Sequence, residues 1–128
     1  RPSLYPPMGL FTKRPKPIAL ESIAHLEELV QSGRPVLIDF MQTNCQPCRT
    51  MDGIVNELAE EFDGAVYVVK ANAANVPDAF RKFKVMSTPT FMVLTTRPGA
   101  NTFTQRWRAS GLVKKDILVK NLESAARS

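Results

Sequence analysis

Histidine and cysteine are scarce in this sequence. Its 128 residues include one histidine, His25, and two cysteines, Cys45 and Cys48. A structural zinc site takes about four ligands, mostly cysteine and histidine, so these three residues are too few to form one. No apolar run approaches the roughly 20 residues that a membrane-spanning helix needs. The sequence therefore predicts no metal site and no membrane-spanning helix, and it gives no sign of a cofactor.

Glycine-rich phosphate-binding loops and known nucleic-acid motifs are also absent, although the formal net charge is +5. The basic residues are scattered over the amino-terminal tail and residues 81–84, 106–108 and 114–120. Clustered basic residues, rather than scattered ones, are typical of nucleic-acid binding. We therefore expect no specific nucleic-acid partner, and a solvated basic surface that could face anionic lipid or an acidic protein.

Both cysteines belong to one motif, Cys45-Gln46-Pro47-Cys48. The apolar, β-branched run at 36–41 before the motif predicts a buried strand, and the spacing of apolar residues after Cys48 predicts a helix. A thiol at the start of a helix meets unpaired N–H groups and the positive end of the helix dipole, which favour the thiolate. We interpret Cys45 as the nucleophile. Cys48, one turn later, is then the resolving thiol that releases a partner from a mixed disulfide.

A purely structural disulfide is the alternative interpretation of this pair. Closing so short a loop removes little chain entropy from the unfolded state, so such a disulfide would stabilise the fold only weakly. The sequence favours a redox pair over a structural one without excluding the latter.

Two segments carry a resemblance to a known family. VLIDFMQTNCQPCRTM resembles the active-site segment of the thioredoxins, and KVMSTPTFMVL resembles their later segment, in which a cis-proline opens a strand. The resemblance extends from about residue 18 to about residue 125. It implies an α/β thioredoxin fold, with a mixed central sheet flanked by helices. It also implies a monomeric thiol–disulfide oxidoreductase, more a reductase than an oxidase, that acts on protein disulfides and is recharged by an upstream electron donor.

The same resemblance assigns roles to further residues. Pro89 would be the cis-proline beside the cysteines, with Thr88 offering backbone groups to an extended substrate; the alternative is an ordinary trans proline at a strand edge. Asp39 would be the buried acid that takes the proton of Cys48, and Lys70 would steady its charge. The alternative for Asp39 is a solvent-exposed strand position. The positions expected to contact substrate are Asn44, Gln46, Pro47, Thr88, Pro89 and Gly111.

Several residues depart from the usual thioredoxin pattern. Asn44 replaces the tryptophan before the first cysteine, Gln46 replaces a glycine, and Gly53 replaces a helix-kinking proline. Thr88 stands where thioredoxins commonly carry isoleucine. We therefore expect partner choice to differ, and the redox direction stays open. A non-catalytic alternative is a thioredoxin-fold adaptor or redox sensor with little turnover.

The sequence divides into a proline-rich basic tail, residues 1–17, and a thioredoxin-like domain, residues 18–128. The composition of the tail predicts an extended linker, or an arm that docks through Leu4, Tyr5, Leu10 and Phe11. Because the chain begins at Arg1 rather than methionine, we expect a removed signal or a membrane tether upstream. This expectation favours an extracytoplasmic or membrane-anchored location over a cytoplasmic one.

Hydrophobic periodicity and turn residues predict the order of the elements. Crossovers through helices require parallel strand pairs, whereas the short turn at 97–101 allows an antiparallel pair. A mixed sheet follows. We expect helices at 18–30, 48–62, 76–83 and 117–125, and strands at 36–41, 66–71, 90–95 and 103–107.

Overall fold

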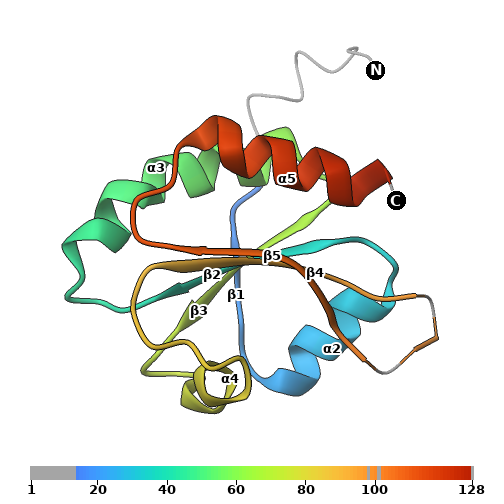
Figure 1. The fold of residues 1–128 in the computed structure, drawn as a ribbon, viewed down its shortest axis with the longest axis horizontal. Helices are drawn as coiled ribbons and strands as arrows, with labels where there is room; N and C mark the ends of the chain where they lie inside the picture. The colour runs from blue at the N-terminus through green and yellow to red at the C-terminus, as the bar shows by residue number, and fades with distance from the viewer. Residues whose placement is uncertain (1–13, 98, 101, 128) are drawn as a thin grey trace.

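The computed structural model describes residues 14–97, 99–100 and 102–127. In these residues a five-stranded sheet lies between two pairs of helices (Figure 1). Most of the predicted tail, residues 1–13, lies outside the described residues, and so does the docking arm proposed for it. The strands are β1 (Ile18–Ala19), β2 (Val36–Met41), β3 (Tyr67–Asn72), β4 (Thr90–Thr95) and β5 (Thr104–Ser110), and the helices are α2 (Ile23–Gln31), α3 (Gln46–Glu61), α4 (Pro77–Lys82) and α5 (Lys115–Arg127).

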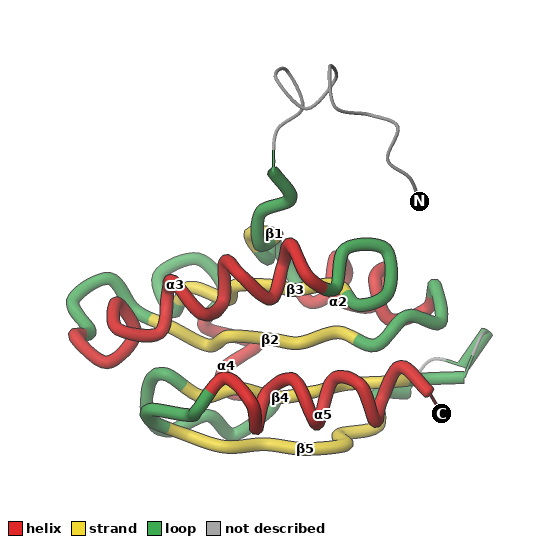
Figure 2. The backbone as a smooth tube through the Cα atoms, turned by 90° about the horizontal axis from the view of Figure 1, so that it is seen from above, coloured by secondary structure: helices red, strands yellow, loops and turns green. Residues whose placement is uncertain are grey.

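The strands lie side by side in the order β1-β3-β2-β4-β5, which Figure 2 shows from above. The pairs β1–β3 and β2–β3 are parallel, and the pairs β2–β4 and β4–β5 are antiparallel. The prediction of a mixed sheet flanked by helices is confirmed. Because β2 and β4 are antiparallel neighbours, the end of β2 and the start of β4 lie at the same edge of the sheet. The cysteine motif and Pro89 are thereby brought to one edge.

Each face of the sheet has its own hydrophobic core. Ile38 and Phe40 of β2 pack in a cluster with α2 and α4 residues such as Leu26 and Ala79. Leu37 of β2 packs on the opposite face, in a cluster with residues of α3 and α5. In Figure 1 the two helix pairs cover opposite faces of the sheet. A strand buried on both faces has a continuous apolar run, which explains the composition of β2.

One predicted boundary is wrong at the amino terminus of the domain. Ile18 was expected to begin a helix, but it lies in β1 and pairs with Val69 of β3. The helix begins only at Ile23, after Ser22, whose hydroxyl accepts a hydrogen bond from the His25 N–H at 2.9 Å. A serine N-cap of this kind is a sequence signal for a helix start, and it marks the true boundary. The final strand also extends further than expected, to Ser110.

Candidate active site

Cys45 is the N-cap residue of α3 and has an extended backbone conformation. Its Sγ accepts a hydrogen bond from the backbone N–H of Cys48 at 3.2 Å, so the sulfur takes the place of a capping oxygen. Pro47 lies in the first helical turn, where its missing N–H costs nothing. Negative charge on the Cys45 sulfur is therefore favoured by a direct donor and by the helix dipole.

A disulfide joins Cys45 and Cys48, whose Cα atoms are 5.2 Å apart. The structure thus has the oxidised form of the motif. Cys45 is 8% exposed and Cys48 is 2% exposed, so Cys45 is the more accessible of two well-covered residues. The two sulfur atoms are close enough for one to displace a partner from the other.

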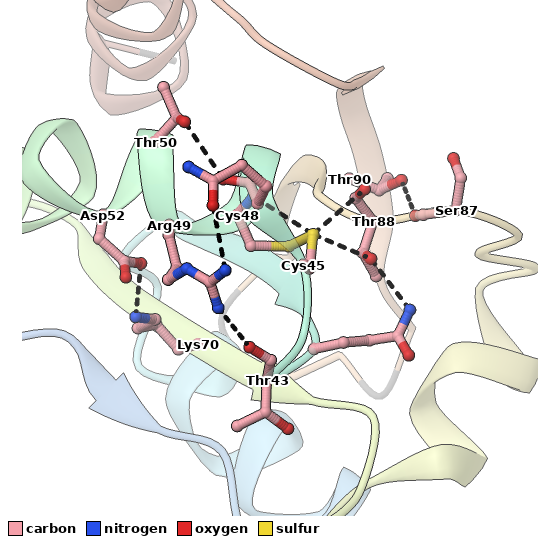
Figure 3. Close-up of a disulfide and its surroundings, with 12 residues drawn as sticks. Thr43, Cys45, Cys48, Arg49, Thr50, Asp52, Lys70, Ser87, Thr88 and Thr90 are labelled. Atoms are coloured by element: carbon pink, nitrogen blue, oxygen red, sulfur yellow. Dashed lines mark hydrogen bonds and ion pairs between the residues drawn. A yellow bond between two sulfur atoms is a disulfide. The ribbon is translucent and has the colours of Figure 1, made fainter.

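Thr88 meets Cys45 from the other side of the site, and Pro89 and Gly111 lie next to it. The Thr88–Pro89 peptide bond is cis, as expected. The Thr88 hydroxyl donates to the Cys45 Sγ at 3.4 Å, and the Thr88 carbonyl oxygen lies 3.6 Å from the same sulfur (Figure 3). Gly111 donates its N–H to the Pro89 carbonyl oxygen at 2.8 Å. The segments just before β4 and just after β5 are thus joined beside the disulfide.

The rim of the site on the α3 side is polar. Asn44, Gln46 and Pro47 are all exposed, as expected of positions that meet a substrate. The Arg49 guanidinium donates to the Thr43 carbonyl oxygen at 3.2 Å and to the Gln46 Oε1 at 3.0 Å. Arg49 was not among the predicted site residues, although its place directly after Cys48 on a helix would have put it near the motif.

Exposed apolar side chains follow on the opposite side. Met86 is 91% exposed and directly precedes the Ser87–Pro89 segment, and Leu112 is 66% exposed and directly follows Gly111. Large exposed apolar residues next to a reactive group are typical of a binding surface. The sequence interpretation missed both residues, because exposure cannot be read from residue type alone.

Asp39 is buried in β2 and is 1% exposed, so the solvent-exposed alternative is wrong. It pairs with Phe91 of β4 and lies two residues after Leu37, and both of these belong to the core on the α3 side of the sheet. Asp39 therefore faces the helix that carries Cys48. Neither of its carboxyl oxygens has a hydrogen-bond partner among the described residues. Burial raises the pKa of Asp39 to about 7. The positive charge of Lys70 opposes this rise, and the negative charge of Asp52 adds to it.

Lys70 is the register partner of Asp39 on β3, but its ammonium group bonds elsewhere. Its Nζ lies 2.9 Å from the Oδ1 of Asp52 on α3, as Figure 3 shows. The charge of Lys70 still favours the Asp39 carboxylate, but the ion pair of Lys70 is with Asp52. Asp52 was missed because its position on α3, one turn after Cys48, becomes informative only when the helix is placed over β3.

No group of three or more histidine, cysteine, aspartate or glutamate side chains able to hold a metal ion occurs in residues 14–97, 99–100 and 102–127. The site itself brings together the two sulfur atoms, the buried carboxyl group of Asp39 and the hydrogen-bond donors around them.

Comparison with known proteins gives a consistent result. The family model described as Thioredoxin matches residues 16–123. Thioredoxin from Pyropia yezoensis is 31% identical over 75% of this chain and 84% of its own. Thioredoxin 1 from Synechococcus elongatus is 31% identical over 76% of this chain and 85% of its own. The solved structure of a mutant thioredoxin from Halobacterium salinarum superposes with a TM-score of 0.74 at 24% identity, covering 90% of this chain and 96% of that one, which supports the fold alone.

These relatives correct one expectation. The preference for an extracytoplasmic or membrane-anchored location is wrong, because the matched relatives from Nostoc, Synechocystis and Synechococcus elongatus are thioredoxins of the cytoplasmic type. Over the part of the chain that the structure describes, no helix is both long and apolar enough to cross a bilayer. The tether expected upstream of Arg1 lies outside this sequence.

Fold, motif and relatives agree on one conclusion. The Cys45–Cys48 disulfide of the C-x-x-C motif and the match of the Thioredoxin family model over residues 16–123 point to the same family. The chain belongs to the thioredoxin family and is a protein thiol–disulfide oxidoreductase.

Proposed function

We propose that the chain works as a reductase of protein disulfides, with Cys45 as nucleophile, Cys48 as resolving thiol and Asp39 as proton acceptor. The observation that carries this proposal is the position of Cys45 at the N-cap of α3, with its sulfur bonded to that of Cys48. The cap supplies the donor that a thiolate needs. The pairing puts the second thiol within reach to complete the exchange.

In the first step, the Cys45 thiolate attacks one sulfur of a substrate disulfide. A bond forms between the Cys45 sulfur and that substrate sulfur, and the substrate S–S bond breaks. The other substrate sulfur leaves as a thiolate and takes a proton from water. The substrate is now half reduced and held in a mixed disulfide.

In the second step, Cys48 loses its proton and attacks the Cys45 sulfur. The Cys45–Cys48 disulfide forms, the mixed disulfide breaks, and the second substrate sulfur leaves as a thiolate. Two electrons have then passed from the motif to the substrate. Because a pKa of about 7 lets Asp39 both accept and release a proton near neutral pH, it suits the role of base for Cys48. An external dithiol then returns the motif to the reduced form.

Substrate would lie across the two sides of the site. The backbone of Thr88, together with Pro89 and the half-buried Gly111, would meet an extended peptide, and the exposed Asn44, Gln46 and Pro47 would form its border. Exposed apolar surface on the far side comes from Met86 and Leu112. This surface would contact the substrate in place of the aromatic residue that Asn44 replaces.

Residues 18–128 are proposed as the catalytic domain, and residues 1–17 as a separate tail. The elements that the structure describes run from Ile18 of β1 to Arg127 of α5, which supports the bounds of the catalytic domain. Both thiols, Asp39 and Thr88 come from one chain, so we propose that the monomer is the working unit.

The test is reduction of insulin disulfides by the protein with dithiothreitol as electron donor. We expect the wild type to accelerate insulin precipitation and Cys45→Ser to abolish the acceleration. In Cys48→Ser, mixed disulfides should accumulate because the resolving attack is lost. If Cys48→Ser traps no more disulfide-linked protein than Cys45→Ser does, protein disulfide exchange is not the function.

A further inference from the structure

Gln42, Thr88 and Cys45 form a chain of hydrogen bonds at the mouth of the site. The Gln42 side-chain Nε2 donates to the Thr88 Oγ1 at 3.0 Å, and the Thr88 Oγ1 donates to the Cys45 Sγ at 3.4 Å. Gln42 lies in the loop after β2, and Thr88 lies 46 residues further along, just before β4. Figure 3 shows the Thr88 hydroxyl directed at the sulfur.

The direction of these bonds follows from the number of protons available. A threonine hydroxyl has one proton and two lone pairs. When Gln42 donates its N–H to one lone pair, the hydroxyl proton is left for another acceptor, and the Cys45 sulfur lies within reach. A sulfur in a disulfide or a thiolate has no proton of its own, so it can only accept. If the amide were turned so that its oxygen met Thr88, the hydroxyl proton would point at Gln42 and the sulfur would lose this donor.

We propose that Gln42 is a positioning residue that aims the Thr88 hydroxyl proton at the Cys45 sulfur and so stabilises the attacking thiolate. This proposal rests on the proposed function, in which Cys45 is the nucleophile. The thiolate then has two donors, the Cys48 N–H from α3 and the Thr88 hydroxyl from the β4 side. Donors from two elements hold the sulfur more firmly than the helix cap alone.

Other charged and titratable groups near the sulfur come from several elements. On α3 the Arg49 guanidinium is tied to the Thr43 carbonyl oxygen and to Gln46, and Asp52 is paired with Lys70 of β3. Asp39 lies beneath the site in β2. None of these groups is altered when Gln42 is replaced, so a change at Gln42 isolates the effect of the Thr88 hydroxyl.

The test measures how fast iodoacetamide alkylates Cys45 across pH, in a Cys48→Ser background that leaves one thiol. Removing a hydrogen bond to a charged group costs about a factor of ten, so Thr88→Val should slow alkylation about tenfold at pH values below the midpoint of the profile. Gln42→Leu should slow it about threefold, because the hydroxyl can then rotate away. Gln42→Glu should slow it more than Gln42→Leu, since a carboxylate accepts the hydroxyl proton and adds negative charge. All three profiles should move to higher pH and converge where Cys45 is fully ionised.

A double-mutant cycle separates positioning from a direct effect. If Gln42 acts through Thr88, then Gln42→Leu should have no effect once Thr88 is valine. Equal effects of Gln42→Leu with and without the hydroxyl would overturn the proposal, and so would an unchanged profile in the single variant. Thermal unfolding of the Gln42 variants should stay near that of the parent, because Gln42 is exposed, whereas Thr88 is half-buried and the stability of Thr88→Val is measured alongside. A wild type that fails to reduce insulin would overturn the proposed function, whereas a non-additive cycle would still support the role of Gln42.

Discussion

Lys70 donates to Asp52 at 2.9 Å, while Asp39, its register partner on the neighbouring strand, has no hydrogen-bond partner in the part of the chain that the structure describes. The buried acid is therefore not neutralised by direct contact with the lysine. The charge of Asp52 also opposes ionisation of Asp39. Burial first, and then the opposing charges of Lys70 and Asp52, thus set the proton affinity of the Asp39 carboxyl group next to the redox helix.

Replacing Asp39 by asparagine should stabilise the protein at high pH. The pKa of Asp39 is about 7 in the folded protein against 3.8 as the reference value, so the folded state binds more protons between these pH values. The contribution of protonated Asp39 to the free energy of unfolding of the wild type is fully present below about pH 4. It is lost as the pH rises to about 7 and is absent above that. A shift of about three pKa units corresponds to roughly 4 kcal/mol in the free energy of unfolding.

We therefore expect Asp39→Asn to exceed the wild type in unfolding free energy by a few kcal/mol at about pH 8, and to match it near pH 4. Urea unfolding of both oxidised proteins at the two pH values measures this difference. A constant difference between the proteins at both pH values would show that Asp39 titrates alike in the folded and unfolded states.

Replacing Asp52 by asparagine should lower the pKa of Asp39. The substitution removes a negative charge that raises this pKa and frees Lys70, whose attraction lowers it. The pKa can be followed from the carboxyl carbon shift of Asp39 by NMR. Glu57→Gln, which removes a charge from the same helix at an ion pair with Lys115, is the matched control and should leave the Asp39 midpoint in place.

Much of this site can be predicted from the sequence, and the reason differs between residues. The cysteine motif and the strand before it are local patterns, so residues 36–41 and the start of α3 follow directly from periodicity. The burial of Asp39 also follows, because its neighbours on both sides are apolar. The two-residue strand β1 could not be predicted, since its pairing with β3 joins segments far apart in the chain.

Asp52 and Gln42 were missed for a related reason. Each acts through a residue far away in the sequence, Lys70 for Asp52 and Thr88 for Gln42. Which carboxylate a lysine pairs with depends on how a helix is rotated over the sheet, and no local pattern records that rotation. Hydrogen bonds and ion pairs between side chains of different elements are therefore the part of the site that could not be predicted from the sequence.

In the reduced protein, Cys45 should be alkylated well before Cys48. Cys45 is the more exposed residue and its sulfur lies at the helix cap, whereas Cys48 is 2% exposed inside the helix. Brief treatment with iodoacetamide at mildly acidic pH, followed by peptide mapping, measures the order of labelling. Equal or reversed labelling would contradict the assignment of Cys45 as nucleophile.

Replacing Gly53 by alanine should stabilise α3. Gly53 is exposed within the helix, and an added Cβ would have nothing within 4 Å. Alanine restricts the unfolded chain more than glycine, so the gain should be about 0.5–1 kcal/mol in the free energy of unfolding. Gly64→Ala is the matched control, because Gly64 also has open space but a φ of +86°. The control should be destabilised, and a stabilised control would show that backbone conformation is not what decides these two sites.

Asp39→Asn should also slow the resolving step of the exchange. Asparagine keeps the size of the side chain but cannot take the proton of Cys48, and a positioned base is worth about a hundredfold in rate. Single-turnover reduction of a disulfide peptide, quenched with acid, separates formation of the mixed disulfide from its resolution. We expect formation to stay near the wild-type rate, since the proposed role of Asp39 concerns the proton of Cys48 alone, and resolution to fall about a hundredfold at about pH 7. The deficit should shrink as pH rises, because hydroxide then deprotonates Cys48 directly. Unchanged resolution at neutral pH would leave Asp39 as a structural residue, and the higher stability of the same variant at alkaline pH would then be its only effect.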